Sequence, residues 1–129
     1  MAVSLQAAAA ILSSGVDGVG YSTGAGGTTT QATDKSTGVT INKASGAITL
    51  NNAALAAAAE VSFTVTNSSV ASTDVIVVNH SSAGTAGAYL VGISAVGSGS
   101  FSITVSNVSA GSLSEAIVIS FAIIKAVSA

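Results

Sequence analysis

The chain has 129 residues and few ionisable groups: three lysines, five carboxylates and one histidine, with a formal net charge of −2 at pH 7. Cys, Pro, Trp and Arg are absent, which excludes disulfides and thiolate metal sites and leaves no basic patch for nucleic acid or anionic lipid. Chemical catalysis usually requires several titratable groups held close together. The composition therefore indicates a structural or binding protein, with no cofactor, and not an enzyme.

The apolar content is high, but it comes mostly from small side chains. Hydrophobic residues make up 49% of the chain and the mean hydropathy is +0.74, yet only three Phe and two Tyr are present to fill space. A chain of this length forms one domain with a modest core. Because few charges keep its surface solvated, we expect part of that surface to be buried against other copies, as a homotrimer or another cyclic oligomer, or against a larger partner.

The N-terminus is predicted to be a separate arm, residues 1–18, ahead of a domain spanning residues 19–129. Residues 2–13 are Ala-rich and form the one plausible helix; the alternative is an arm that orders only on a neighbouring molecule. No Lys or Arg precedes its apolar stretch, so it does not fit a secretory signal. No apolar run reaches the roughly 20 residues of a membrane-spanning helix. We expect an intracellular product, no membrane association, and partner contacts through the large apolar side chains of the arm, Val3, Leu5, Ile11 and Leu12.

A glycine-rich run, residues 18–30, follows the arm. No Lys-Ser or Lys-Thr pair follows its glycines, and no helical pattern begins there, as a phosphate-binding loop would require. This run is predicted to be a linker or turn.

Beyond this run, apolar and polar residues alternate with a period of two, which predicts β-strands. Residues 39–41 and 48–50 are expected to form a short hairpin or adjacent strands, with the turn at residues 43–46. Residues 61–66 and 101–106 share one alternation, which is typical of half-buried strands.

Three further segments complete the predicted strands. Residues 88–96 alternate, whereas residues 75–78 and 116–124 are near-continuous apolar runs, typical of central strands covered on both faces. Residues 53–59 could form a helical turn or a loop at the edge. Seven or eight short strands separated by Gly, Ser and Asn clusters predict an all-β fold. We expect an antiparallel β-sandwich of jelly-roll or immunoglobulin-like type, with a short N-terminal arm or helix.

The sequence offers little catalytic chemistry. His80 lies beside Asn79 in a turn-like cluster and is expected to be a hydrogen-bonded or exposed loop residue, since no second His or Cys could share a metal with it. The carboxylates are isolated along the chain, and no Gly-x-Ser-x-Gly motif is present. We assign no catalytic, cofactor-binding or metal-binding residue. Asn67, Asn79 and Asn107 match the glycosylation sequon, which matters only in a eukaryotic secretory setting.

Several segments, in order, resemble those of small virion proteins of tailed phages and prophages. The resemblance covers about residues 19–125 and rests on six stretches: 20–43, 48–56, 61–68, 77–80, 84–89 and 110–125. It implies a non-enzymatic component of the virion, either a capsid decoration (cement) protein or the distal domain of a fibre. It carries over no catalytic motif.

Of these two roles, the sequence favours capsid decoration. No stalk, heptad or collagen-like repeat precedes residue 19, and a short apolar arm suits a protein that clips onto a shell. The expected partners are the major capsid protein and other copies of the chain, on a capsid surface assembled in the host cytoplasm. The alternatives are a trimeric tail-fibre or head-fibre tip with a receptor-binding or glycan-binding role, and a bacterial surface or carbohydrate-binding module.

Overall fold

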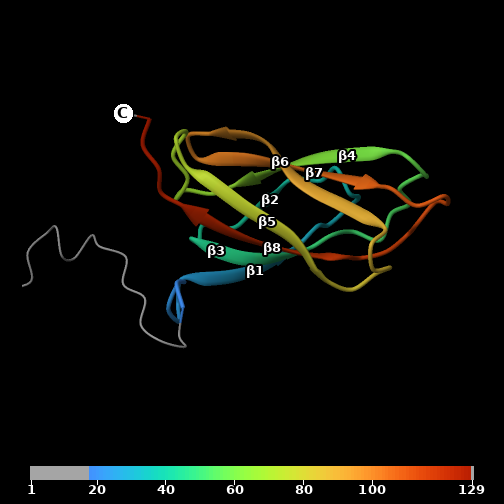
Figure 1. Cartoon of the computed structure of the whole chain (residues 1–129), viewed down its shortest axis with the longest axis horizontal. Coiled ribbons are helices and arrows are strands. Elements are labelled where there is room, and N and C mark those ends of the chain that lie inside the picture. The colour runs from blue at the N-terminus through green and yellow to red at the C-terminus, as the bar shows by residue number, and fades with distance from the viewer. Residues whose placement is uncertain (1–17, 129) are drawn as a thin grey trace, which may run out of the picture.

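A computed structural model describes residues 18–128, which fold into eight β-strands with no helix among them (Figure 1). The strands are β1 (Gly26–Thr30), β2 (Val39–Thr40), β3 (Ser45–Thr49), β4 (Glu60–Thr66), β5 (Val75–Ser82), β6 (Tyr89–Gly97), β7 (Ser100–Asn107) and β8 (Val118–Ile124). The expected all-β class is confirmed. The proposed helix at residues 2–13 lies outside the described residues.

The strands form two four-stranded sheets, in the orders β1-β3-β8-β5 and β2-β4-β7-β6. Figure 1 shows them as two layers, which is the arrangement of a β-sandwich. Most neighbouring strands are antiparallel, as expected, but β1 pairs with β3 and β2 pairs with β4 in parallel, so both sheets are mixed. The two parallel pairs depart from the antiparallel sandwich that was expected, because periodicity does not distinguish parallel from antiparallel partners.

The core lies between the two sheets and is built by the alternation read from the sequence. In β7, every second residue is buried, and Phe101, Ile103 and Val105 point inward at 2% exposure or less. Phe101 meets Phe121 of β8 across the core, with ring centroids 5.4 Å apart. Ser and Thr occupy the alternate positions and point away from the core. In β4 and β7 the period-two pattern therefore predicted which face is buried. In β6 an irregularity between Ile93 and Ala95 breaks the alternation, so that Ala95 is exposed and Val96 packs against the core.

Two expectations about individual strands were wrong. Residues 39–41 and 48–50 do not form a hairpin or adjacent strands: β2 pairs with β4 and β3 pairs with β1 and β8, in opposite sheets. Ile41 and Ile48 reach the same core from opposite sides, so either arrangement buries both and gives the same sequence pattern. For residues 53–59 a helical turn and a loop were both left open. They form a loop, in which Leu55 bridges to Leu113.

The apolar run at residues 75–78 was expected to be a central strand and is instead the start of β5, an edge strand. Val75 and Val77 point outward and are half-exposed. The second run becomes β8, which does lie between two neighbours, β3 and β5. Of its outward residues, Val118, Ser120 and Ala122 are partly buried and Ile124 is exposed, and no further layer of residues 18–128 covers them.

Candidate functional site

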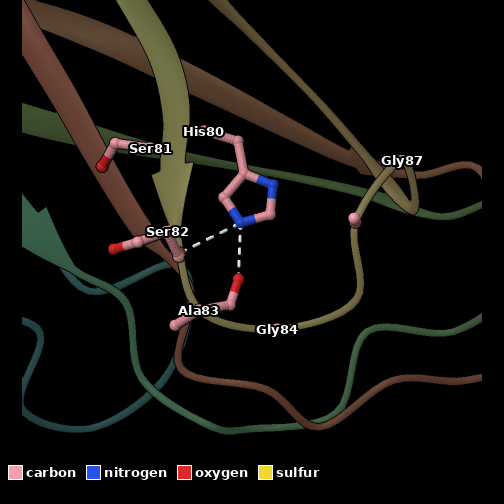
Figure 2. Close-up of a pocket in the computed structure, with 7 residues that line it drawn as sticks. His80, Ser81, Ser82, Ala83, Gly84 and Gly87 are labelled. Atoms are coloured by element: carbon pink, nitrogen blue, oxygen red, sulfur yellow. Dashed lines mark hydrogen bonds between the residues drawn. The ribbon is translucent and has the colours of Figure 1, made fainter.

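A shallow pocket of about 290 Å³ lies where β5 runs into the loop before β6 (Figure 2). Its lining comes from one continuous stretch: His80, Ser81, Ser82, Ala83, Gly84, Ala86 and Gly87. His80 was expected in a turn, but it belongs to β5, where it pairs with Ile119 next to an irregularity in the register. The irregularity bends the end of the strand, so that the loop folds back over the imidazole ring.

His80 uses one ring nitrogen to hold this loop. Its Nε2 lies 3.1 Å from the carbonyl oxygen of Ser82 and 2.6 Å from that of Ala83. Carbonyl oxygens only accept hydrogen bonds, so Nε2 must carry the proton and donate. The ring meets Tyr89 edge-on at a centroid distance of 5.7 Å. Figure 2 shows the other ring nitrogen on the side of Gly87, where the neutral tautomer offers an acceptor to the pocket.

Glu115, in the chain leading into β8, also holds the loop between β5 and β6. Its carboxylate accepts hydrogen bonds from the Thr85 amide (3.0 Å), the Thr85 hydroxyl (2.7 Å) and the Tyr89 hydroxyl (2.9 Å). The bonds from Thr85, and then that from Tyr89, lower the pKa of Glu115 below its usual value. Burial, with the carboxylate nearby, raises the pKa of Tyr89 to about 12.

The loop also packs tightly against the chain leading into β8. Gly84 has a φ of +73°, and a Cβ placed on it would lie 2.6 Å from Ile117 Cγ2. Only glycine fits both the backbone conformation and the space. Together with the hydrogen bonds to Glu115, this contact holds the loop against the chain leading into β8.

Lys35 joins three loops at one end of the sandwich. Its side chain is buried, and its ammonium group donates hydrogen bonds to the carbonyl oxygens of Asn51, Ala53 (2.8 Å) and Glu115 (2.8 Å). Burial lowers the pKa of Lys35, and the charge of Glu115 opposes this shift. Buried Gln31 adds bonds to the carbonyls of Lys35 and Thr37. Nothing in the sequence pattern marked Lys35 as buried, because it lies in a polar loop.

Asp34 and Asp74 form hydrogen bonds with residues close to them. Asp34 accepts bonds from Ser36 and Thr37 within one turn, and these bonds lower its pKa. Asp74 accepts from the Ala71 amide and forms an ion pair with Lys125 at 2.7 Å, and both contacts lower its pKa. Within residues 18–128, no three His, Asp or Glu side chains lie close enough together to hold a metal ion.

Two of the three sequon asparagines are structural. Asn67 follows β4 and Asn107 is the last residue of β7; both are at most 1% exposed and form hydrogen bonds through the nitrogen and the oxygen of the side-chain amide. Each accepts a hydrogen bond from the backbone amide of the serine two residues later, which forms a tight turn. The backbone amides of Asn67 and Asn107 donate to the carbonyl oxygens of Gly99 and Ala59, each at 2.9 Å. Gly99 directly precedes β7 and Ala59 directly precedes β4, so the two turns lie at equivalent ends of this strand pair. In the sequence, these two turns are marked by the same pattern, an alternating run followed by Asn-x-Ser.

The outward faces of the two sheets carry almost no charge. On β4 and β7 the outward side chains are mostly hydroxyls: Ser62, Thr64, Thr66, Ser102, Thr104 and Ser106, with Glu60 at one end. On the other sheet, no residue of β1, β3, β5 or β8 is Asp, Glu, Lys or Arg. A corner of this second face is apolar, where Val75 and Val77 of β5 lie opposite Ile124 and Ala122 of β8. We call these four residues the β5–β8 patch.

The sequence pattern did not reveal the β5–β8 patch, because near-continuous apolar runs predict strands that are covered on both faces. Val75, Val77 and Ile124 are 52%, 51% and 49% exposed. The partner-binding residues that it did select, Val3, Leu5, Ile11 and Leu12, lie outside the described residues, so the structure does not place them near this patch or the pocket.

Comparison with known proteins adds no relative: no family model, no curated protein and no solved structure matches the chain. Between residues 18 and 128, no helix is long and apolar enough to cross a membrane.

Proposed function

We propose that the protein is a non-enzymatic structural component of a tailed-phage virion, most specifically a capsid decoration protein. In this role it binds the outside of the head shell and stabilises it, in contact with the major capsid protein and with other copies of itself in a homotrimer. The sandwich would be of the jelly-roll or immunoglobulin-like type. The proposal starts from the resemblance of residues 19–125 to small virion proteins.

The observation that supports it best is the lack of charge on the sheet faces. The cores of protein interfaces are depleted of Lys, Glu and Asp, because each buried charge would lose its hydration. The face of β1-β3-β8-β5 contains none of these residues and exposes the β5–β8 patch. A face of this composition suits permanent contact with protein better than contact with water alone.

The polar residues support the same role by a different observation. Lys35, Glu115, Asp74 and Lys125 each bond to backbone or side-chain groups that fix loops. His80 donates to two main-chain carbonyls instead of activating a serine hydroxyl. The contacts of these side chains stabilise the fold, which fits a structural role.

A fibre tip is the second candidate, and the His80 pocket favours it. The pocket is open to solvent, is lined by small residues, and presents an imidazole acceptor on the side of Gly87. An acceptor of this kind can form a hydrogen bond with a hydroxyl of a receptor glycan. In this version the pocket, and not a sheet face, would be the contact made with the host cell.

Locating the protein on particles distinguishes the two candidates. Virions from the phage or prophage that encodes the chain would be incubated with gold-labelled antibody against the purified protein and imaged by electron microscopy. Decoration predicts gold distributed over the heads. Gold confined to fibre tips would support the second candidate, and particles that carry the protein nowhere would refute both.

The arm can be tested on the same particles. Deleting residues 2–14 should leave the melting temperature of the purified domain unchanged, because every described strand lies between Gly26 and Ile124. It should lower the occupancy of heads prepared without the protein, since each buried Leu or Ile adds roughly 1.5–3 kcal/mol to docking. Equal occupancy by the full and shortened chains would show that the arm is not the anchor.

A further inference from the structure

We infer that the β5–β8 patch lies at the rotation axis of a homo-oligomer, where Val77 of one copy contacts Val77 of the next. This inference rests on the self-association in the proposed function and assigns a surface to it. The four patch residues form two cross-strand pairs, Val75 with Ile124 and Val77 with Ala122, so their side chains stand together on one outward corner of the sheet.

The charge distribution identifies a second copy as the occupant. In a cyclic oligomer, residues near the axis meet their own counterparts, so any charge there would face a like charge. The strands of this sheet contain no charged residue of the Asp, Glu, Lys or Arg type. A face without charge can therefore meet its own copy at the axis without repulsion.

The charges closest along the chain fit this requirement. Asp74 precedes β5 and Lys125 follows β8, and they form an ion pair with each other at 2.7 Å. The Asp74 carboxylate is almost fully buried beneath the lysine, whose side chain remains 63% exposed. The two charges therefore cancel within one copy, at the border of the patch.

The position of β5 also permits a second copy of the chain to approach the patch closely. It is the edge strand of its sheet, and edge strands of soluble proteins are commonly protected by charged residues, proline or a bulge. Residues 75–79 contain no charge and no proline, and the irregularity in β5 comes only after His80. The exposed part of the edge that borders the patch thus has none of these protections.

The test uses Leu90 as a matched control. Leu90 lies on β6, on the outward face of the other sheet, and at 64% exposed it is more accessible than Val77. Val77→Asp and Leu90→Asp each place one carboxylate on an exposed apolar position. Mass would be measured by light scattering on the full chain, with circular dichroism to verify folding.

We expect the wild-type protein and Leu90→Asp to have the same oligomeric mass, a whole multiple of 12.2 kDa greater than one chain. We expect Val77→Asp to remain folded and to have the mass of one chain, 12.2 kDa. A wild-type oligomer that Val77→Asp leaves intact would refute the assigned surface and leave self-association standing. A monomeric wild type would refute self-association as well, and would leave the patch to another protein. Dissociation of both variants would also contradict the assignment.

A second measurement covers the case in which Val77→Asp fails to fold. The chain has no cysteine, so Val77→Cys and Leu90→Cys each introduce a single thiol. With a short bis-maleimide, Val77→Cys should form covalently linked pairs at dilutions where Leu90→Cys remains unlinked. Equal linking of the two variants, or none at Val77, would overturn the inference.

Discussion

The loops and the strand faces of this protein use their side chains in opposite ways. Lys35, Asp74, Glu115 and Lys125 lie in loops or beside strand ends, and each is bonded to groups that hold loops in place. The outward strand positions carry hydroxyls, apolar side chains and the amide of Asn79, with Glu60 as the one charge on the described strands. In our account, the charged side chains stabilise the loops, and the surfaces proposed to contact other molecules are uncharged. Changes in the loops should therefore reduce stability, whereas changes on the faces should alter assembly.

Lys35→Met should have the largest effect on stability. It keeps the buried stem but removes the ammonium group, which leaves the carbonyls of Asn51, Ala53 and Glu115 without their donor. A buried acceptor left unsatisfied costs about 1–3 kcal/mol, so we expect a loss of at least about 2 kcal/mol in urea unfolding. Lys43→Met removes the same charge from an exposed site and should stay within about 0.5 kcal/mol. Equal effects of the two variants would contradict the structural role of Lys35.

Asn107→Ala should come next. The Asn107 amide donates to Leu55 at 2.8 Å and to Gly111 at 2.9 Å, and its oxygen accepts from Ser109. Losing these bonds inside the fold should lower the free energy of unfolding by about 1–3 kcal/mol. Asn79→Ala, at an exposed position of β5, should change it by no more than about 0.5 kcal/mol. If Asn79 proved the more sensitive of the two, the turn after β7 would not be a structural anchor.

Acid should loosen the loop between β5 and β6. Hydrogen bonds from Thr85 and Tyr89 hold the pKa of Glu115 below its ordinary value of 4.5. The ionised form therefore favours the folded state: its contribution is complete above about pH 4.5 and is lost as the pH falls through the folded pKa. We expect the melting temperature of the wild type to fall between pH 5 and pH 3. Because Asp34 and Asp74 also have lowered pKa values, Glu115→Gln should flatten only part of this dependence. An unchanged slope in Glu115→Gln would show that the loop does not depend on this carboxylate.

His80→Ala should have the smallest effect in this series. An exposed loop histidine without structural contacts would change the free energy of unfolding by no more than about 0.5 kcal/mol. The bonds to Ser82 and Ala83 raise the expected loss to about 0.5–1.5 kcal/mol in thermal unfolding. Assembly should remain intact, because the ring lies away from the outward faces. Loss of a measured enzymatic activity in His80→Ala would overturn the non-enzymatic account.

The sequence predicted local structure well where a residue's pattern decides its burial. The alternation at residues 61–66 and 101–106 located β4 and β7 and the buried side of each. It could not show that β2 and β3 belong to different sheets, because Ile41 and Ile48 are buried in either arrangement. It also misplaced Val75 and Val77, since an exposed apolar residue on an edge strand gives the same sequence pattern as one inside a sheet.

The site was harder to predict because its contacts join residues that are distant in sequence. Glu115 reaches Thr85 and Tyr89 across two strands, and Lys35 reaches the carbonyl of Glu115 across 80 positions. Side-chain bonds to backbone groups have no sequence motif when the partners are this far apart. The Asn-x-Ser turns after β4 and β7 were an exception, because their bonds close within two residues.

Light scattering of the unmodified full-length protein over a dilution series tests the central claim most directly. If the uncharged strand faces are assembly surfaces, the mass should remain a whole multiple of 12.2 kDa, three chains in the trimeric form, down to low micromolar concentration. A mass of 12.2 kDa at every concentration, in a protein that stays soluble, would contradict the account.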